Sequence, residues 1–204
     1  TIRSWSQGII NYKDTAPANI AKVRTFINKE LKKYAKNAVT NLSSTFREEL
    51  TFNWDISGWD ISEVTGLYMT FMRAESFNRP LNSWNTRNVT SLFWAFYGAK
   101  KFNQHLNNWD VSKVLTMEYT FSGATEFNGS LATWNTTALT NTRGTFSGCK
   151  AFNQPVNHFK MGNVWNMEWM FDGCEIFNRP LDAWDVKNAT TLASTFNSAY
   201  VFNQ

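Results

Sequence analysis

Three aspartates occur at the same place in a repeated sequence pattern, and carboxylates are the residues with which enzymes cleave polysaccharides. Asp60, Asp110 and Asp185 each follow a tryptophan. Such an enzyme needs two carboxylates, or a carboxylate and a basic residue, that converge on one bond. Asn85, Asn135 and a lysine interrupt the series, and a repeated aspartate at a bend commonly accepts hydrogen bonds from its own turn. We therefore expect these aspartates to be structural, and we predict no catalytic residues and no enzymatic activity.

The histidines and cysteines do not form a recognisable catalytic or metal site either. His105 and His158 occupy different positions of the pattern in units that are not adjacent. Cys149 and Cys174 are one repeat apart, at a position where other units have alanine. Stacked strands lie about 4.8 Å apart, so a disulfide is one reading, and two buried free thiols are the other. Neither cysteine shares its register with further ligands, so we expect no metal and no cofactor.

A fixed period of 25 residues governs most of the chain. Phe-Asn pairs recur from Phe52 to Phe202, a second phenylalanine series runs from Phe46 to Phe196, and a third series runs from Trp59 to Trp184, with Phe159 in place of one tryptophan. One such unit is too small to bury its own aromatic side chains. The period therefore predicts a stack of repeats, in which neighbouring units close the core.

Spacing within a unit predicts two kinds of local structure. Residues 109–111, Trp-Asp-Val, have the aromatic and β-branched character of a short strand. The apolar residues that follow recur at steps of three, four and three, which is typical of one helical face; they are Val114, Met117, Phe121 and Ala124. The prediction is an α/β repeat solenoid with one short strand and one or two helical turns in each coil.

The first part of the chain differs from the repeats. Residues 15–37 combine apolar residues at three- and four-residue steps with a lysine-rich opposite face. We predict two regions, an N-terminal segment 1–38 with a basic amphipathic helix that caps the stack, and a solenoid of 25-residue repeats over 39–204. Binding of this helix to a membrane surface is an alternative.

The charge distribution argues against nucleic-acid binding, and the hydropathy argues against a membrane-spanning segment. The net charge is +4, but residues 1–50 hold nine Lys and Arg against four Asp and Glu, which leaves eleven against twelve in the remainder. A nucleic-acid-binding cleft is not expected from a nearly neutral repeat region. No apolar run in this chain approaches the ~18–20 residues of a membrane span.

The asparagine after each phenylalanine has a structural and a functional reading. A side-chain amide can satisfy backbone groups at a bend, and identical coils align such amides into a ladder; a line of polar ligand contacts is the alternative. We interpret the column as a structural ladder of Asn53, Asn78, Asn103, Asn128, Asn153, Asn178 and Asn203.

The segments 102–104 (Phe-Asn-Gln), 109–114 (Trp-Asp-Val-Ser-Lys-Val) and 121–124 (Phe-Ser-Gly-Ala) together resemble a known repeat. It is the 25-residue repeat of BspA-like leucine-rich-repeat surface proteins and mycoplasma-type surface lipoproteins, which also occurs in protists and algae. The resemblance spans about residues 17–204. It implies a right-handed, leucine-rich-repeat-like solenoid that is extracellular or displayed at the cell surface, with adhesion as its activity and no catalytic residues.

Several aromatic residues are not needed for the three core series. They fall on a second face beside the inward one, together with Met69, Met72, Glu118, Arg143 and Glu168. We predict a binding stripe of Tyr68, Phe93, Trp94, Tyr97, Tyr119, Trp165 and Trp169. Exposed aromatic residues commonly anchor protein partners; burial within the chain and stacking on sugars are the alternatives.

The function expected from these observations is a non-enzymatic surface or secreted scaffold that binds a protein partner through the stripe. A structural subunit of a larger assembly is one alternative, and a glycan-binding or polysaccharide-active solenoid is another.

Overall fold

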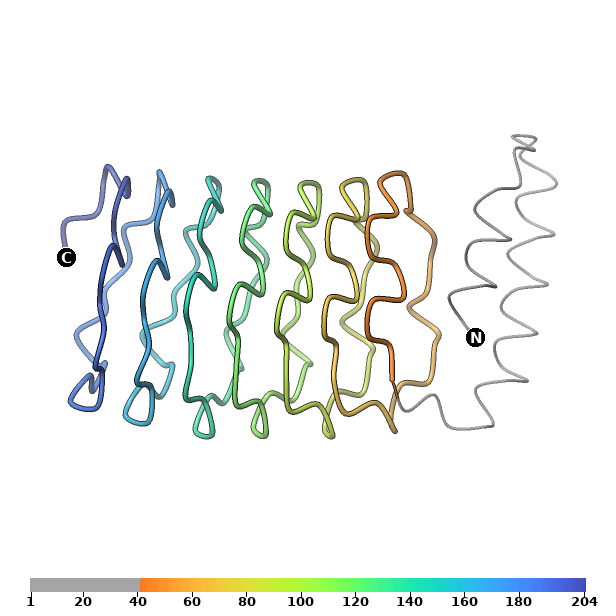
Figure 1. Ribbon diagram of the computed structural model, residues 1–204, viewed down its shortest axis with the longest axis horizontal. Helices are drawn as coiled ribbons and strands as arrows, with labels where there is room; N and C mark the ends of the chain where they lie inside the picture. The colour runs from red at the N-terminus through yellow and green to blue at the C-terminus, as the bar shows by residue number, and fades with distance from the viewer. Residues whose placement is uncertain (1–40) are drawn as a thin grey trace, which may run out of the picture.

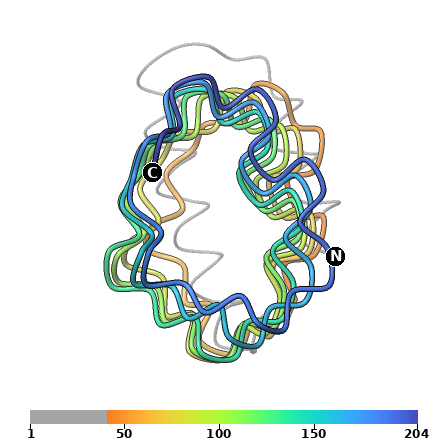
Figure 2. The same cartoon turned by 90° about the vertical axis from the view of Figure 1, so that its left-hand side faces the viewer.

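A computed structural model describes residues 41–204, which form a row of stacked coils from the orange end to the blue end of the chain (Figure 1). Viewed along the row, successive coils superpose in one oval outline (Figure 2). The predicted capping helix, and with it the segment 1–38, lies outside the described residues. The fold is therefore described from the repeats alone.

Neighbouring coils meet in parallel through single-residue bridges. Five such bridges connect residues that are 25 positions apart in the sequence, and they join Gly66, Ser91, Thr116, Asn141, Asn166 and Thr191 in that order. The register is thus one coil per repeat along the whole row.

The predicted secondary structure is wrong. Within residues 41–204 no residue is helical, and the only extended pairing is the set of isolated bridges. The predicted strand at 109–111 has no regular partner, and the predicted helical turns at 114–124 are a succession of tight turns around one bridge residue. Residues 41–204 are therefore not an α/β solenoid with helical turns, and the predicted leucine-rich-repeat-like solenoid is not supported.

Two features of the backbone explain why no helix forms there. The N–H of Thr120 donates to the carbonyl of Met117, three residues back, but the N–H of Met117 donates to the carbonyl of Asn141 in the next coil, at 2.9 Å. Tyr119 and Gly123 have positive φ angles of 50° and 71°, whereas a right-handed helix needs negative φ at every residue. Alternate N–H groups consequently bond between coils rather than along one helix.

The apolar periodicity nevertheless predicted the core side chains. Val114, Met117, Phe121 and Ala124 are all fully buried. Repeated tight turns return side chains to the inside at steps of three and four residues, as a helix does. The spacing therefore reports which side chains are buried, and not which backbone buries them.

Two stacks of phenylalanine rings form the centre of the core. Rings of the series that begins at Phe46 lie 5.1–5.8 Å apart between coils, and those of the series that begins at Phe52 lie 5.5–5.9 Å apart. Within a coil the two rings are closer; the centroids of Phe121 and Phe127 are 4.1 Å apart. Such offset stacking adds to the gain from burying apolar area.

The asparagines that follow the second series connect consecutive coils. The backbone N–H of Asn78 donates to Oδ1 of Asn53 at 3.0 Å, and the same bond repeats at 2.8–3.1 Å up to Asn203. In three coils the glutamine that follows the asparagine donates a further bond to Oδ1 of the asparagine in the preceding coil, as Gln104 does to Asn78. The amides thus satisfy backbone groups that the single bridges leave unpaired.

Candidate functional site

Five aromatic side chains from three consecutive coils contact one another outside the phenylalanine core. The ring centroids of Tyr68 and Phe93 are 5.4 Å apart, those of Phe93 and Trp94 are 5.6 Å apart, and those of Trp94 and Tyr97 are 4.8 Å apart. Tyr119 meets Trp94 edge-on at 5.9 Å. We call these five residues the aromatic surface. Tyr68 is 42% exposed, and the other four are partly exposed.

An unusual backbone conformation presents part of this surface. Trp94 and Tyr119 have φ angles of 55° and 50°, and the flanking Met69 and Arg73 have φ angles of 53° and 56°. The left-handed region costs about 1–2 kcal/mol for a residue with a side chain. The carbonyls of the next coil hold the conformation, as the N–H of Trp94 donates to the carbonyl of Glu118.

Arg143 links the aromatic surface to Trp169. Its guanidinium carbon lies 4.7 Å from the ring centre of Trp169 and 5.7 Å from that of Tyr119. The neighbouring Gly144 makes room for this arrangement, because a Cβ on that glycine would lie 2.3 Å from a carbon of the Tyr119 ring. Cation–π contacts of this kind contribute about 0.5–1 kcal/mol at exposed sites.

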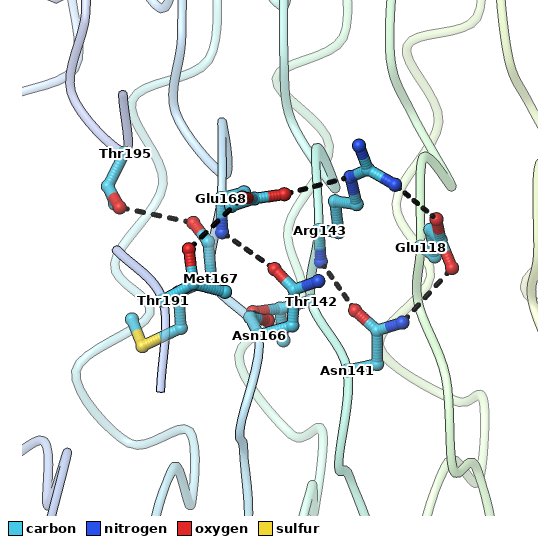
Figure 3. Close-up of polar contacts among 9 residues, drawn as sticks. All are labelled: Glu118, Asn141, Thr142, Arg143, Asn166, Met167, Glu168, Thr191 and Thr195. Carbon is cyan, nitrogen blue, oxygen red and sulfur yellow. Dashed lines mark hydrogen bonds and ion pairs between the residues drawn. The ribbon is translucent and has the colours of Figure 1, made fainter. Parts of the chain in front are cut away.

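A polar network holds Arg143 between two carboxylates (Figure 3). Its Nη1 lies 3.7 Å from an oxygen of Glu118, and its Nε lies 3.2 Å from an oxygen of Glu168. The second oxygen of Glu118 accepts from the amide of Asn141 at 3.0 Å, and the hydroxyl of Thr191 donates to Glu168 at 3.1 Å. The network spans four coils, so both carboxylates are already engaged within the protein.

The Tyr119 hydroxyl stays neutral in this environment. Burial raises the pKa of Tyr119 above its ordinary value, and the positive charge of Arg143 opposes only part of this effect. Tyr119 therefore offers a neutral O–H at physiological pH.

Trp165 lies apart from the other predicted residues. Among the described residues it makes no ring contact with another aromatic side chain, and it is 48% exposed. Its backbone bonds to Thr140 and Thr190, the threonines at the equivalent position on either side. Leu115, which is 51% exposed, stands at the same position two coils away. The sequence reasoning did not select Leu115 for binding, although both residues replace the usual threonine and that departure was the available signal.

Arg73 is the other residue of this region that the sequence reasoning did not select. It stands where the next four coils have glycine, namely Gly98, Gly123, Gly148 and Gly173. A charged residue in a column of positive-φ glycines was the available signal.

The two cysteines are free and buried. The thiol of Cys149 donates to the carbonyl of Phe121 at 2.9 Å, and that of Cys174 donates to the carbonyl of Phe146 at 3.0 Å. Burial raises the pKa of both thiols well above the ordinary range. The free-thiol reading of this pair, and not the disulfide, is the one found.

The repeated aspartates bond to their own turns. Oδ1 of Asp60 accepts from the N–H of Ser62 at 3.0 Å, and Oδ1 of Asp110 accepts from the N–H of Ser112 at 2.9 Å. Asp185 accepts from Lys187 in the same way. These carboxylates therefore have the local partners expected of turn residues.

Residues 41–204 offer neither a cluster of metal ligands nor a membrane-spanning helix. In this region no three His, Cys, Asp or Glu side chains are grouped to hold a metal ion. The same region contains no helix with the length and apolar character needed to cross a membrane.

Successive copies of one unit, joined coil to coil by backbone and asparagine bonds, define a tandem-repeat protein. The chain belongs to the family described as "Mycoplasma protein of unknown function, DUF285", which matches residues 17–132 and 92–204. The resemblance to mycoplasma-type repeats is thereby confirmed at the level of this family. No curated protein and no solved structure matches the chain.

Proposed function

We propose that this protein is a non-enzymatic interaction scaffold, secreted or displayed at the cell surface, that binds a protein partner through the aromatic surface. One observation carries the proposal. Five contacting aromatic rings lie outside a core that is already filled by its own aromatic stacks. The finer assignment to BspA-like surface proteins, with adhesion as the activity, is part of this proposal and rests on the sequence resemblance.

The backbone gives further support. Residues in the left-handed region lower the stability of a fold, and such strain concentrates at functional positions. At the position of Trp94 and Tyr119, other coils have Gly144 or Ser194 with the same positive φ, so the coil geometry does not require an aromatic residue there. A role in recognition accounts for large rings at a costly position, since Trp and Tyr are the commonest anchors of protein interfaces.

A protein partner is favoured over a sugar for this surface. Stacking on a sugar needs an open ring face. The ring of Trp94 is flanked by Phe93 and Tyr97 and meets the edge of Tyr119, and Arg143 lies over Trp169. Such a closely packed patch suits a broad protein contact better than a sugar ring between two platforms.

Site-specific photo-cross-linking tests the proposal. A photoreactive phenylalanine analogue replaces Tyr68 or Tyr97 in the whole chain, and the protein is irradiated with surface extracts of the source cells and of host cells. The matched control carries the analogue at Lys187, whose side chain is 71% exposed outside the aromatic surface. We expect a discrete protein adduct from positions 68 and 97 and none from position 187.

Competition distinguishes a specific contact from nonspecific labelling by the photoreactive group. Excess unlabelled wild-type protein should abolish the adduct, whereas a folded Tyr68→Ala/Tyr97→Ala variant should not. Equal adducts from all three positions, or equal competition by the variant, would refute the proposal. An adduct that disappears after glycosidase treatment would point to the glycan alternative, and one found only in a large native complex would point to the structural-subunit alternative.

A further inference from the structure

Arg73 is a charged residue at a position that the backbone geometry reserves for glycine in four coils. Its φ angle is 56°, and the equivalent glycine in the next coil, Gly98, has a φ angle of 66°. The side chain of Arg73 extends across that glycine, because a Cβ placed on Gly98 would lie 3.2 Å from Cγ of Arg73. Arg73 thereby lies beside the coil that carries Trp94 and Tyr97, and its side chain is exposed.

The carboxylates around the aromatic surface already have ion-pair partners. Glu118 and Glu168 bind Arg143, and Glu48 is paired with Arg47 at 3.3 Å. Within residues 41–204, the guanidinium of Arg73 makes no ion pair. A cation without an ion-pair partner in this part of the chain therefore lies against Gly98, next in sequence to Tyr97 of the aromatic surface.

A second polar group on this surface also lacks an acceptor. The indole Nε1 of Trp94 is buried and has no hydrogen-bond partner among the described residues. Buried donors are almost always paired in folded proteins, and an unpaired one calls for an explanation. A docking partner cannot reach that buried nitrogen, whereas the side chain of Arg73 is exposed, so Arg73 is the donor of this region that a partner can bind.

Resting on the proposed function, we infer that the aromatic surface binds an acidic, apolar segment of its protein partner, in which carboxylates alternate with large apolar side chains. The rings receive the apolar side chains, and the guanidinium of Arg73 binds a carboxylate through paired hydrogen bonds. A basic segment would bring like charge to Arg73 and would be disfavoured.

Three synthetic peptides test the charge preference. They share the same leucine and phenylalanine positions, and their remaining positions are all Glu, all Gln or all Lys. Binding to the whole chain is measured by fluorescence anisotropy at two salt concentrations. We expect the Glu peptide to bind about tenfold more tightly than the Gln peptide, the Lys peptide to bind most weakly, and the preference to shrink as salt screens the charges.

Two substitutions assign that preference to Arg73. Arg73→Gly removes the charge and installs the residue that four of the equivalent positions carry, so the fold is kept, and it should abolish the preference for Glu over Gln. Arg87→Gln is the matched control, because it removes one charge from an exposed arginine outside the aromatic surface and should leave the preference intact. Trp94→Ala should weaken the binding of all three peptides.

The outcomes separate this inference from the function on which it rests. Equal binding of the three peptides, tighter binding of the Lys peptide, or an unchanged preference in Arg73→Gly would overturn the acidic-segment inference. A lack of binding by all three peptides would also overturn the inference. In each case the cross-linking of Tyr68 and Tyr97 to a protein partner would remain as an independent test of the proposed function.

Discussion

Nε2 of His158 donates a hydrogen bond to the carbonyl oxygen of Leu131, 3.2 Å away. In neighbouring coils a tryptophan indole makes the equivalent bond; Nε1 of Trp134, for example, donates to the carbonyl of Leu106 at 2.9 Å. Phe159 occupies the tryptophan position in the coil of His158 and has no N–H to offer. Because a carbonyl only accepts, His158 carries a proton on Nε2 and supplies the bond that Phe159 lacks.

This substitution of one donor for another predicts a rescue. His158→Ala removes the bond to Leu131 and should lower the free energy of unfolding by about 1 kcal/mol. In a Phe159→Trp background the indole should restore the donor, so that His158→Ala costs much less. Urea denaturation of the four proteins of this cycle measures the coupling. Equal losses in both backgrounds would show that the histidine does not replace the indole.

The left-handed backbone at Trp94 predicts that glycine stabilises the fold more than alanine does at this position, which is the reverse of the usual order. Glycine normally destabilises a chain relative to alanine, but at positive φ it avoids a cost of about 1–2 kcal/mol. Trp94→Gly should therefore be more stable than Trp94→Ala by about 1 kcal/mol. Thermal or chemical denaturation measures the difference.

Leu115 provides the control for that comparison. Leu115 is exposed and does not have a positive φ. Leu115→Ala should therefore be more stable than Leu115→Gly, which is the usual order of these two residues. If alanine were also the more stable residue at position 94, the strain assigned to Trp94 would be disproved.

The buried thiols predict low reactivity in the folded protein. Burial raises the pKa of Cys149 and Cys174, and only the thiolate reacts with alkylating agents. At about pH 8, iodoacetamide should leave both thiols unmodified in the folded chain and alkylate both after denaturation. Mass spectrometry with and without denaturant measures this, and alkylation of the folded chain at the rate of an exposed thiol would contradict the buried state.

The turn at Asp110 predicts a small dependence of stability on acid. Hydrogen bonds from the hydroxyl and the N–H of Ser112 lower the pKa of Asp110. A carboxyl whose pKa is lowered by folding stabilises the fold above its unfolded pKa of about 3.9, and this contribution is lost as the pH falls through the lower folded value.

Asp110→Asn tests that linkage with a residue that the protein already uses at this position. The side chains of Asn85 and Asn135 accept the equivalent turn bond, so the variant should differ from wild type by less than about 0.5 kcal/mol at neutral pH. Below about pH 4 the wild type should lose stability more steeply than the variant. Parallel unfolding curves from neutral to acid pH would contradict the assignment to Asp110.

The candidate site could be predicted from the sequence in part. Repeat positions separate core aromatics from additional ones, which is why Tyr68 and Trp94 stand out as candidates for binding. The sequence does not indicate that Arg143 lies between the rings of Tyr119 and Trp169, nor that Trp165 lies apart. Those relationships depend on side-chain directions at left-handed residues, and no helical face reproduces them.

The sequence alone determined the 25-residue register, the buried phenylalanine and aliphatic positions, and the column of asparagines, because identical units stacked in register bring identical side chains together. Only the tertiary structure decided the backbone. Steps of three and four residues bury the same side chains in a helix and in a chain of tight turns, and here the carbonyls of the next coil provide partners for alternate N–H groups. Those partners lie about one repeat away in the sequence, so a local pattern could predict burial but not the hydrogen bonds that replace the helix.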